Sequence, residues 1–298
     1  GSIEVIVFPK LFEKLKKNDQ ALDDYNKAIE SDPKFVEAYL NRGLYYFALD
    51  NRERAIADYT KIIELNPKLV WAYEARGLFY SELGKCEQAI IDFNMAIDLG
   101  TKHASTYGER GIAYGELGNF RKGILDLEKA IELNPGYGKF YWGRGNIYAK
   151  LGNHNQAIND YTKAIELNPT GIQWAYFAYN NRGNSYTALK DYGQAISDFT
   201  HAIQIVQNIE SSLSNSSSPY LNRGGAYYSI GNYHQAIKDY DKAIELNPQD
   251  FMIYTNRGQA YYSLGNNDQA IRDYRVGATL GDKKAQELLK QYFKKIYP

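Results

Sequence analysis

Residues 141–169 read YWGRGNIYAKLGNHNQAINDYTKAIELNP and contain two helix-length segments joined by a short turn. The first segment, 141–150, ends at Leu-Gly-Asn, and the second, 156–167, ends at Asn-Pro. Glycine and asparagine are typical of the turns between helices, and proline is typical of the residues that follow a helix. This stretch therefore predicts one helix–turn–helix unit.

The same unit recurs along the chain in register with an Arg-Gly pair. The arginines of these pairs are Arg42, Arg76, Arg110, Arg144, Arg182, Arg223 and Arg257. Four of the six intervals between them are 34 residues long, and the other two are 38 and 41 residues long. Self-similarity at such a period indicates a repeat protein, in which each short unit packs only on its neighbours.

This register divides the chain into seven repeats between two end segments. The repeats are expected at 36–69, 70–103, 104–137, 138–171, 176–209, 217–250 and 251–284. Residues 1–35 are expected to form a degenerate repeat or cap, and residues 285–298 a helix that caps the last repeat. The extra residues at 172–175 predict a longer first helix in the fifth repeat, and the serine-rich 210–216 predicts a loop.

Two tyrosine positions and one glycine position recur in the first helix of every repeat. In the first repeat they are Tyr39, Tyr46 and Gly43, which share about 100° of helix surface with Arg42. We predict that the tyrosines form the core between the helices, because each ring can bury a large apolar area while its hydroxyl reaches the rim of the core. The glycine, together with small residues such as Ala55 of the second helix, should let the paired helices approach closely.

Each repeat resembles the tetratricopeptide repeat family in its length and in its characteristic positions. In the repeat quoted above these positions are Tyr141, Gly145, Tyr148, Leu151, Gly152, Ala157, Tyr161, Ala164 and Pro169. The resemblance covers nearly the whole chain and implies an all-α fold, a right-handed superhelical α-solenoid with a concave groove lined by the first helices. It does not imply a particular ligand.

The arginine of each repeat faces the predicted core, at a position where the family commonly has an aliphatic residue. A buried guanidinium without a partner would cost several kcal/mol. An aspartate stands 16 residues later in every repeat, from Asp58 after Arg42 to Asp273 after Arg257. We therefore predict that each arginine pairs with an aspartate of its own or the preceding repeat. The alternative is that the arginines reach into the groove and bind anions.

The opposite side of the first helices is expected to line the groove and carries carboxamides in the later repeats. The candidate peptide-binding residues are Asn41, Trp71, Trp142, Asn146, Asn181, Asn184, Asn222, Asn256 and Gln259. A carboxamide offers both a donor and an acceptor, so it can bind a peptide unit whatever the side chain of the ligand. Two alternatives remain open: the asparagines serve only solubility, or the tryptophans pack between helices and form no anchor pockets.

The segment 181–184, with the sequence NRGN, is similar to the asparagine-bearing inner helices of the superhelix in O-linked GlcNAc transferases. In those proteins a ladder of asparagines holds substrate peptides. The resemblance is local and implies no catalytic domain in this chain. It favours the groove asparagines as contacts for an extended polypeptide.

Composition argues against several other functions. Lys plus Arg and Asp plus Glu each number 35, so no basic excess is available to bind nucleic acid. Cys86 is the only cysteine, which is typical of reducing compartments, and we expect a cytoplasmic protein. No apolar run approaches the roughly 18 residues of a membrane helix, so we expect no membrane insertion. The histidines lack partners at metal-ligand spacing, and we expect no metal site, cofactor or catalytic residue.

These features predict a non-enzymatic adaptor that binds an extended peptide segment of a partner protein in its groove. The alternative is a structural scaffold that self-associates into a homo-oligomer, or the repeat region of a larger protein. Light scattering would separate the two, because self-association insensitive to changes at Asn181 and Asn222 would favour the scaffold.

Overall fold

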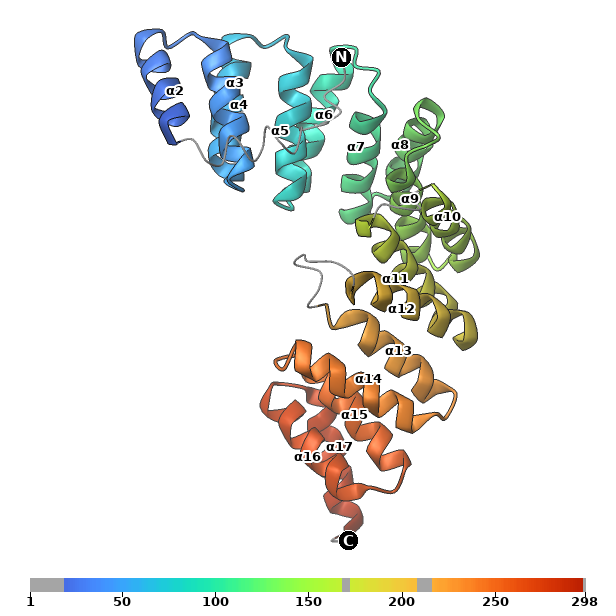
Figure 1. Ribbon diagram of the computed structural model, residues 1–298. Coiled ribbons are helices and arrows are strands. Elements are labelled where there is room, and N and C mark those ends of the chain that lie inside the picture. Colours follow the sequence, from blue (N-terminus) through green and yellow to red (C-terminus); the bar gives the residue numbers. More distant parts are fainter. Residues whose placement is uncertain (1–18, 168–171, 208–215, 297–298) are drawn as a thin grey trace. The chain divides into compact units, whose positions relative to one another are not determined.

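The structure, a computed structural model, describes residues 19–167, 172–207 and 216–296, and every regular element in these ranges is an α-helix (Figure 1). The first helices of the pairs are α3 (Val36–Ala48), α5 (Val70–Glu82), α7 (Ala104–Glu116), α9 (Gly138–Lys150), α11 (Ile172–Ala188), α13 (Ser218–Ser229) and α15 (Phe251–Ser263). The second helices are α4 (Arg52–Leu65), α6 (Cys86–Asp98), α8 (Phe120–Leu133), α10 (His154–Glu166), α12 (Tyr192–Gln207), α14 (Tyr233–Leu246) and α16 (Asn267–Thr279). Helix α2 (Asp19–Ser31) precedes these pairs and α17 (Lys283–Ile296) follows them.

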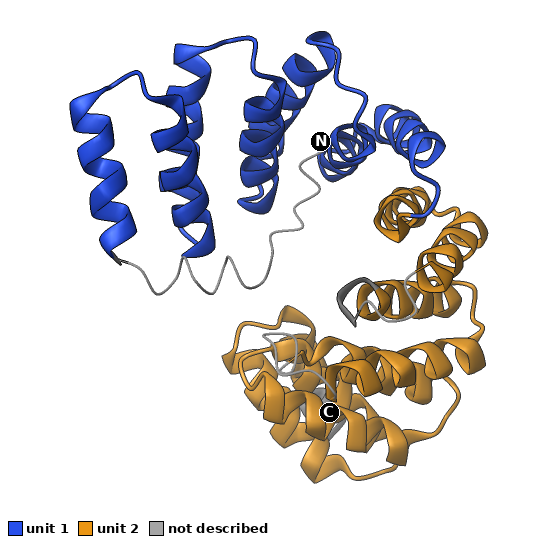
Figure 2. Cartoon of the chain, turned by 45° about the horizontal axis from the view of Figure 1, so that its top comes forward, with its two compact units in different colours: residues 1–136 blue, residues 137–298 orange. Residues whose placement is uncertain are grey.

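The chain forms two compact units, unit 1 up to residue 136 and unit 2 from residue 137 (Figure 2). Within each unit every helix packs on the next one in the chain. The first helices also contact one another, α5 with α7 in unit 1 and α9, α11, α13 and α15 in sequence in unit 2. This stacking of consecutive helix pairs confirms the predicted all-α solenoid of repeats.

Of the segments that depart from the repeat pattern, the structure describes the insertion at 172–175 as part of a helix. Helix α11 is 17 residues long and begins at Ile172, whereas α3 and α9 have 13 residues, so the predicted lengthening is confirmed. Residues 1–18 of the expected N-terminal repeat or cap, and nearly all of the loop expected at 210–216, lie outside the described residues.

A residue in the left-handed backbone conformation ends the turn after each first helix. Five of these residues are glycines with φ between 69° and 78°, namely Gly84, Gly118, Gly152, Gly231 and Gly265. Asp50 and Lys190 occupy the same place in the other two turns, with φ of 62° and 64°. Glycine is favoured here because a Cβ atom makes this conformation unfavourable.

The glycines of the Arg-Gly pairs lie where the two helices of a pair meet. A Cβ atom added at any of the seven would lie 2.6–2.9 Å from a side chain of the second helix. Those side chains are Tyr59, Phe93, Leu127, Tyr161, Phe199, Tyr240 and Tyr274. The prediction that glycine permits the close approach of the paired helices is therefore confirmed.

These second-helix side chains, and not the first-helix tyrosines, form the deepest part of the core. All seven are 0–3% exposed. At the Tyr39 position the tyrosine is buried in three repeats and half-buried in four, and at the Tyr46 position it is half-buried in all seven. The Tyr46 ring packs against the core cluster of unit 1 without being enclosed by it. The tyrosines at both positions thus contribute to the core, those at the Tyr46 position from its edge.

The predicted arginine–aspartate pairs are present in all seven repeats. Each arginine donates from Nε and Nη2 to the carboxylate of the aspartate in its own repeat, at 2.6–3.2 Å. The aspartates are 2–9% exposed. Each guanidinium also lies 5.4–6.0 Å from the ring at the Tyr39 position. The arginines are therefore paired inside the stack, and their alternative role as anion ligands in a groove is not supported.

Two adjacent glycines of α13 allow a controlled test of this packing. A Cβ at Gly224 would lie 2.7 Å from the Tyr240 ring, whereas a Cβ at Gly225 would have its nearest neighbour 4.0 Å away. Both alanine variants gain the same helix propensity, so their difference isolates the clash. We expect Gly224→Ala to be about 1–3 kcal/mol less stable than Gly225→Ala. Urea denaturation of the two variants measures this difference, and equal stabilities would contradict the packing.

Candidate peptide-binding site

Four carboxamides from three neighbouring first helices are joined by hydrogen bonds in unit 2. Asn146 lies on α9, Asn180 and Asn181 lie on α11, and Asn222 lies on α13, and we call these four residues the amide cluster. Asn181 Nδ2 donates to Asn146 Oδ1 at 2.9 Å, and Asn222 Nδ2 donates to Asn180 Oδ1 at 3.2 Å. Asn180 Nδ2 lies 3.5 Å from Asn181 Oδ1 and completes the chain of contacts. All four side chains are half-buried.

A tyrosine of the second-helix layer fixes one end of the amide cluster. The Tyr161 hydroxyl, from α10, donates to Asn146 Oδ1 at 2.9 Å. Burial raises the pKa of Tyr161, so the hydroxyl keeps the proton that it donates. Asn146 Oδ1 thus accepts two hydrogen bonds, which orients its Nδ2 group. Among the described residues Asn146 Nδ2 and, at the other end, Asn222 Oδ1 have no recorded partner, so the cluster presents a donor at one end and an acceptor at the other.

The remaining predicted amides of unit 2 do not join this cluster. Asn184 is exposed on α11, and Asn256 is half-buried on α15. Gln259, also on α15, accepts a hydrogen bond from Lys284 Nζ at 3.3 Å. The structure therefore brings together Asn146, Asn181 and Asn222 and leaves these three apart.

The other candidates are tryptophans and a residue of unit 1. Asn41 is exposed on α3. Trp71 is half-buried, with its ring 6.1 Å from the Tyr59 ring in an edge-to-face arrangement against the core of unit 1. Trp142 is half-buried on α9, with its ring 6.1 Å from that of Phe177. Both tryptophans pack between helices, which was the alternative to an open anchor pocket.

Asn180 belongs to the amide cluster but was not among the predicted residues. In four repeats the equivalent position is apolar or glycine, and each of these repeats ends with proline. The residues at this position are Leu40, Gly108, Trp142 and Leu221. In the other three repeats the position is polar and the closing proline is replaced, giving Glu74 with Thr101, Asn180 with Gln207, and Thr255 with Asp282. This joint change within one chain is the signal that could have identified Asn180.

Two of these polar pairs are in direct contact in the core. Thr101 Oγ1 donates to Glu74 Oε1 at 2.6 Å, and Thr255 Oγ1 donates to Asp282. Glu74 is 7% exposed and also accepts from the Thr106 hydroxyl at 2.6 Å. Buried carboxylates need such donors, because an unpartnered one would be costly. These pairs therefore hold the helix junction in place of the proline.

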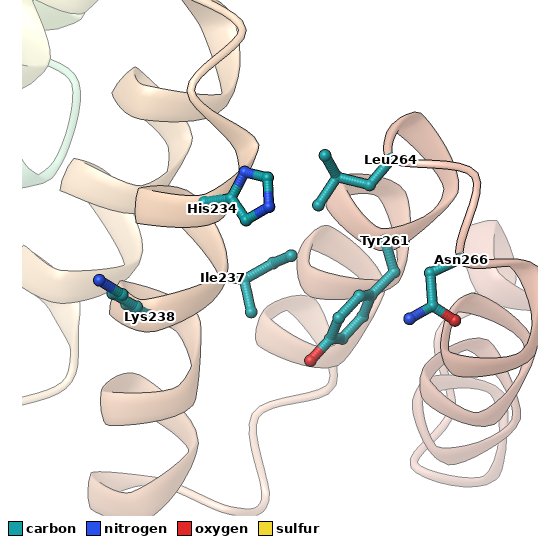
Figure 3. A pocket seen from close by; sticks show the side chains of 6 residues that line it. All are labelled: His234, Ile237, Lys238, Tyr261, Leu264 and Asn266. Atoms are coloured by element: carbon teal, nitrogen blue, oxygen red, sulfur yellow. The ribbon is translucent and has the colours of Figure 1, made fainter.

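A separate surface pocket of about 550 Å³ lies in unit 2 between α14 and the α15–α16 turn. It is lined by His234, Ile237, Lys238, Tyr261, Leu264 and Asn266 (Figure 3). Ile237 and Leu264 extend into the gap beside the Tyr261 ring, whereas the Lys238 amine points away from it (Figure 3). The Asn266 side chain accepts a hydrogen bond from Gln269 N at 3.3 Å and thus caps α16.

Residues 19–167, 172–207 and 216–296 contain neither a candidate metal site nor a candidate membrane span. Among these residues no group of three or more His, Cys, Asp or Glu side chains could hold a metal ion. None of the helices described is both long and apolar enough to cross a membrane.

Family models for tetratricopeptide repeats match this chain. The TPR repeat model matches residues 11–50 and 224–265. Two further tetratricopeptide repeat models match residues 36–69, 104–137, 141–170 and 176–208. A search of curated proteins found no match.

Solved structures of repeat proteins are similar in fold. A tetratricopeptide repeat protein from Parabacteroides merdae has a TM-score of 0.61 at 20% identity, covering 86% of this chain and 97% of that protein. PilF of Pseudomonas aeruginosa has a TM-score of 0.63 at 17% identity, covering 74% and 97%. MamA of Desulfovibrio magneticus, from residue 41 onward, has a TM-score of 0.52 at 16% identity, covering 59% and 94%. At these identities the similarity concerns the fold alone.

Proposed function

Because the chain belongs to the tetratricopeptide repeat family, whose repeats generally mediate protein–protein interactions, we propose that unit 2 binds an extended segment of a partner protein through its amide cluster. The supporting observation is the chain of hydrogen bonds from Asn222 to Asn146 across α13, α11 and α9. An extended peptide needs partners for its backbone N–H and C=O groups, and carboxamides supply both. The protein is then a non-catalytic adaptor.

The hydrogen bonds within the amide cluster favour binding in two ways. They hold the side chains in place before the ligand arrives, which lowers the entropy lost on binding. They also leave the donor of Asn146 and the acceptor of Asn222 available at opposite ends. Because the cluster is uncharged, its contribution to affinity should depend little on salt.

The test is a peptide-library screen against the whole chain, followed by the double variant Asn181→Ala with Asn222→Ala. Each substitution removes about 1 kcal/mol of hydrogen bonding and the support for a neighbouring amide. We expect the selected peptides to bind about thirtyfold more weakly. The matched control is Asn155→Ala with Asn159→Ala, two exposed asparagines of α10 in the same unit. Unchanged affinity in the cluster variant would place the binding site elsewhere.

Exposed apolar residues of unit 1 support a second candidate function, self-association as a scaffold. Ile91 of α6 is 65% exposed and Leu125 of α8 is 57% exposed, at the same position of successive second helices. Large apolar side chains on a surface favour contact with another protein. Light scattering over a range of concentrations tests this candidate. Self-association that is lost in the variant Ile91→Ser with Leu125→Ser would support it, and a monomer at all concentrations would contradict it.

A further inference from the structure

The last described helix, α17, carries a high density of positive charge for a chain of zero net charge. Its sequence, KKAQELLKQYFKKI, contains five lysines and one acidic residue, Glu287. The three lysines whose side chains are described, Lys283, Lys284 and Lys290, are all exposed. The helix therefore has a basic exposed surface.

These lysines differ from those on the second helices. On α4, α8, α10 and α14 an exposed or half-buried lysine pairs with the glutamate three residues later at 2.6–3.2 Å. None of Lys283, Lys284 and Lys290 forms an ion pair with another described residue, although Glu287 lies on the same helix. Their charges remain available to an external anion.

Two observations connect this basic surface to the layer of first helices that carries the amides. Lys284 Nζ donates to Gln259 Oε1 of α15 at 3.3 Å. Lys290 stands 34 residues after Asn256, so it continues, one repeat further, the position that holds Asn181, Asn222 and Asn256. Helix α17 thus takes the place of a next first helix, with lysine where the preceding repeats have asparagine.

The described apolar side chains of α17, up to Leu289, pack within unit 2. Ala285 is fully buried, and Leu288 and Leu289 are half-buried against Tyr274 of α16. A membrane-surface helix needs a free apolar face to enter the lipid boundary. The basic surface is therefore better suited to an acidic polypeptide than to an anionic membrane.

We propose that the lysines of α17 bind an acidic stretch of the same peptide whose neutral stretch lies on the amide cluster. This inference rests on the proposed function and specifies the ligand: an extended segment with carboxylates at one end. Neighbouring helices of this layer, α9, α11, α13, α15 and α17, are about 10 Å apart, so the layer spans about 40 Å. About twelve residues of an extended peptide cover this distance. The carboxylates would then lie beside Lys284 and Lys290, beyond Gln259.

The experiment uses the full chain and labelled peptides of about twelve residues built from serine and alanine. One peptide is neutral, two carry glutamates at either the amino or the carboxyl end, and two carry lysines at those ends. Vesicles of phosphatidylcholine with phosphatidylserine are the membrane probe. The variant is Lys284→Glu with Lys290→Glu, and its charge-matched control is Lys238→Glu with Lys68→Glu, both exposed and without a recorded ion pair.

We expect one acid-ended peptide to bind more tightly than the neutral peptide, with a preference that falls as salt increases. Charge reversal on α17 should weaken that peptide about tenfold and strengthen the lysine-ended peptide of the same polarity. The neutral peptide and the control variant should be unaffected.

The outcomes separate this inference from the proposed function. If the neutral peptide binds and the acid-ended peptides bind no better, the inference fails while the amide cluster stands. If the lysine effects persist but Asn181→Ala with Asn222→Ala changes nothing, the amide cluster fails instead. Lysine-dependent binding to the anionic vesicles without binding of acidic peptides would overturn the inference in favour of a membrane surface.

Discussion

Replacing Arg182 with alanine is expected to lower the free energy of unfolding of unit 2 by about 3–5 kcal/mol. Arg182 donates to both carboxylate oxygens of Asp198, at 2.8 and 2.7 Å, and its third nitrogen donates to Thr162 at 2.9 Å. Asp198 is 3% exposed. The variant leaves this carboxylate buried without its cation, and the loss of solvation is then no longer offset.

The measurement is urea denaturation followed by tryptophan fluorescence in a Trp71→Phe background. The remaining tryptophans, Trp142 and Trp174, both lie in unit 2, so the signal reports on that unit. The control is Lys163→Ala, which removes an exposed pair with Glu166 at 3.2 Å and should cost less than about 0.5 kcal/mol.

A second variant tests the cause of the destabilisation. Arg182→Met with Asp198→Leu removes both charges and should recover most of the lost stability, because an apolar pair of similar volume can replace a buried ion pair. If Arg182→Ala proves as stable as Lys163→Ala, the fork does not stabilise the stack. If the double variant is less stable than Arg182→Ala, the unpaired carboxylate is not the cause.

The arginine–aspartate pairs, in which two guanidinium nitrogens donate to one carboxylate, were predictable because they depend on contacts within one helix pair. Arg182 and Asp198 are separated by 16 residues, as are their counterparts in every repeat, so the pairing follows from the geometry of a single hairpin. The glycine at the helix contact was predictable for the same reason. Because the same spacing occurs in all seven repeats, few other partners for the arginine were possible.

The amide cluster was only partly predictable, because it depends on contacts between successive repeats. Helical spacing predicted that Asn181 and Asn222 lie on the same side of their helices. It did not predict that Asn222 donates a hydrogen bond to Asn180 on α11. Which residues of two neighbouring first helices meet depends on the rotation between repeats, and an insertion such as 172–175 changes the chain length between them. The degree of burial at the Tyr46 position was open for a related reason, since a helical wheel gives a direction but not the distance to the next helix.

Raising the pH above about 10 is expected to destabilise unit 2 steeply, through three tyrosines of its second helices. Tyr161, Tyr240 and Tyr274 are 1–3% exposed. Burial raises the pKa of each of them well above the ordinary value, and neighbouring aspartates raise it further. Above pH 10 the unfolded chain releases these protons while the folded chain retains them, so the unfolded state gains stability. Each tyrosine lowers the free energy of unfolding by about 1.4 kcal/mol per pH unit, and the three together lower it by about 4 kcal/mol per pH unit.

The arginine forks do not contribute to this loss, because guanidinium groups remain charged at this pH. Urea denaturation at a series of pH values, in the Trp71→Phe background, gives the slope, and tyrosinate absorbance should rise together with the loss of helical circular dichroism. Tyr240→Phe with Tyr274→Phe should reduce the slope by about 2.8 kcal/mol per pH unit.

The phenylalanines should fit the core, because Phe93 and Phe199 already occupy the same position in other repeats. Tyr59→Phe, at the same position of the second helix in unit 1, is the control and should leave the slope measured for unit 2 unchanged. A stability of unit 2 that stays constant up to about pH 11 would show that the second-helix tyrosines ionise without unfolding. The rings would then be accessible to water, and the enclosed core on which the amide cluster is built would not exist in that form.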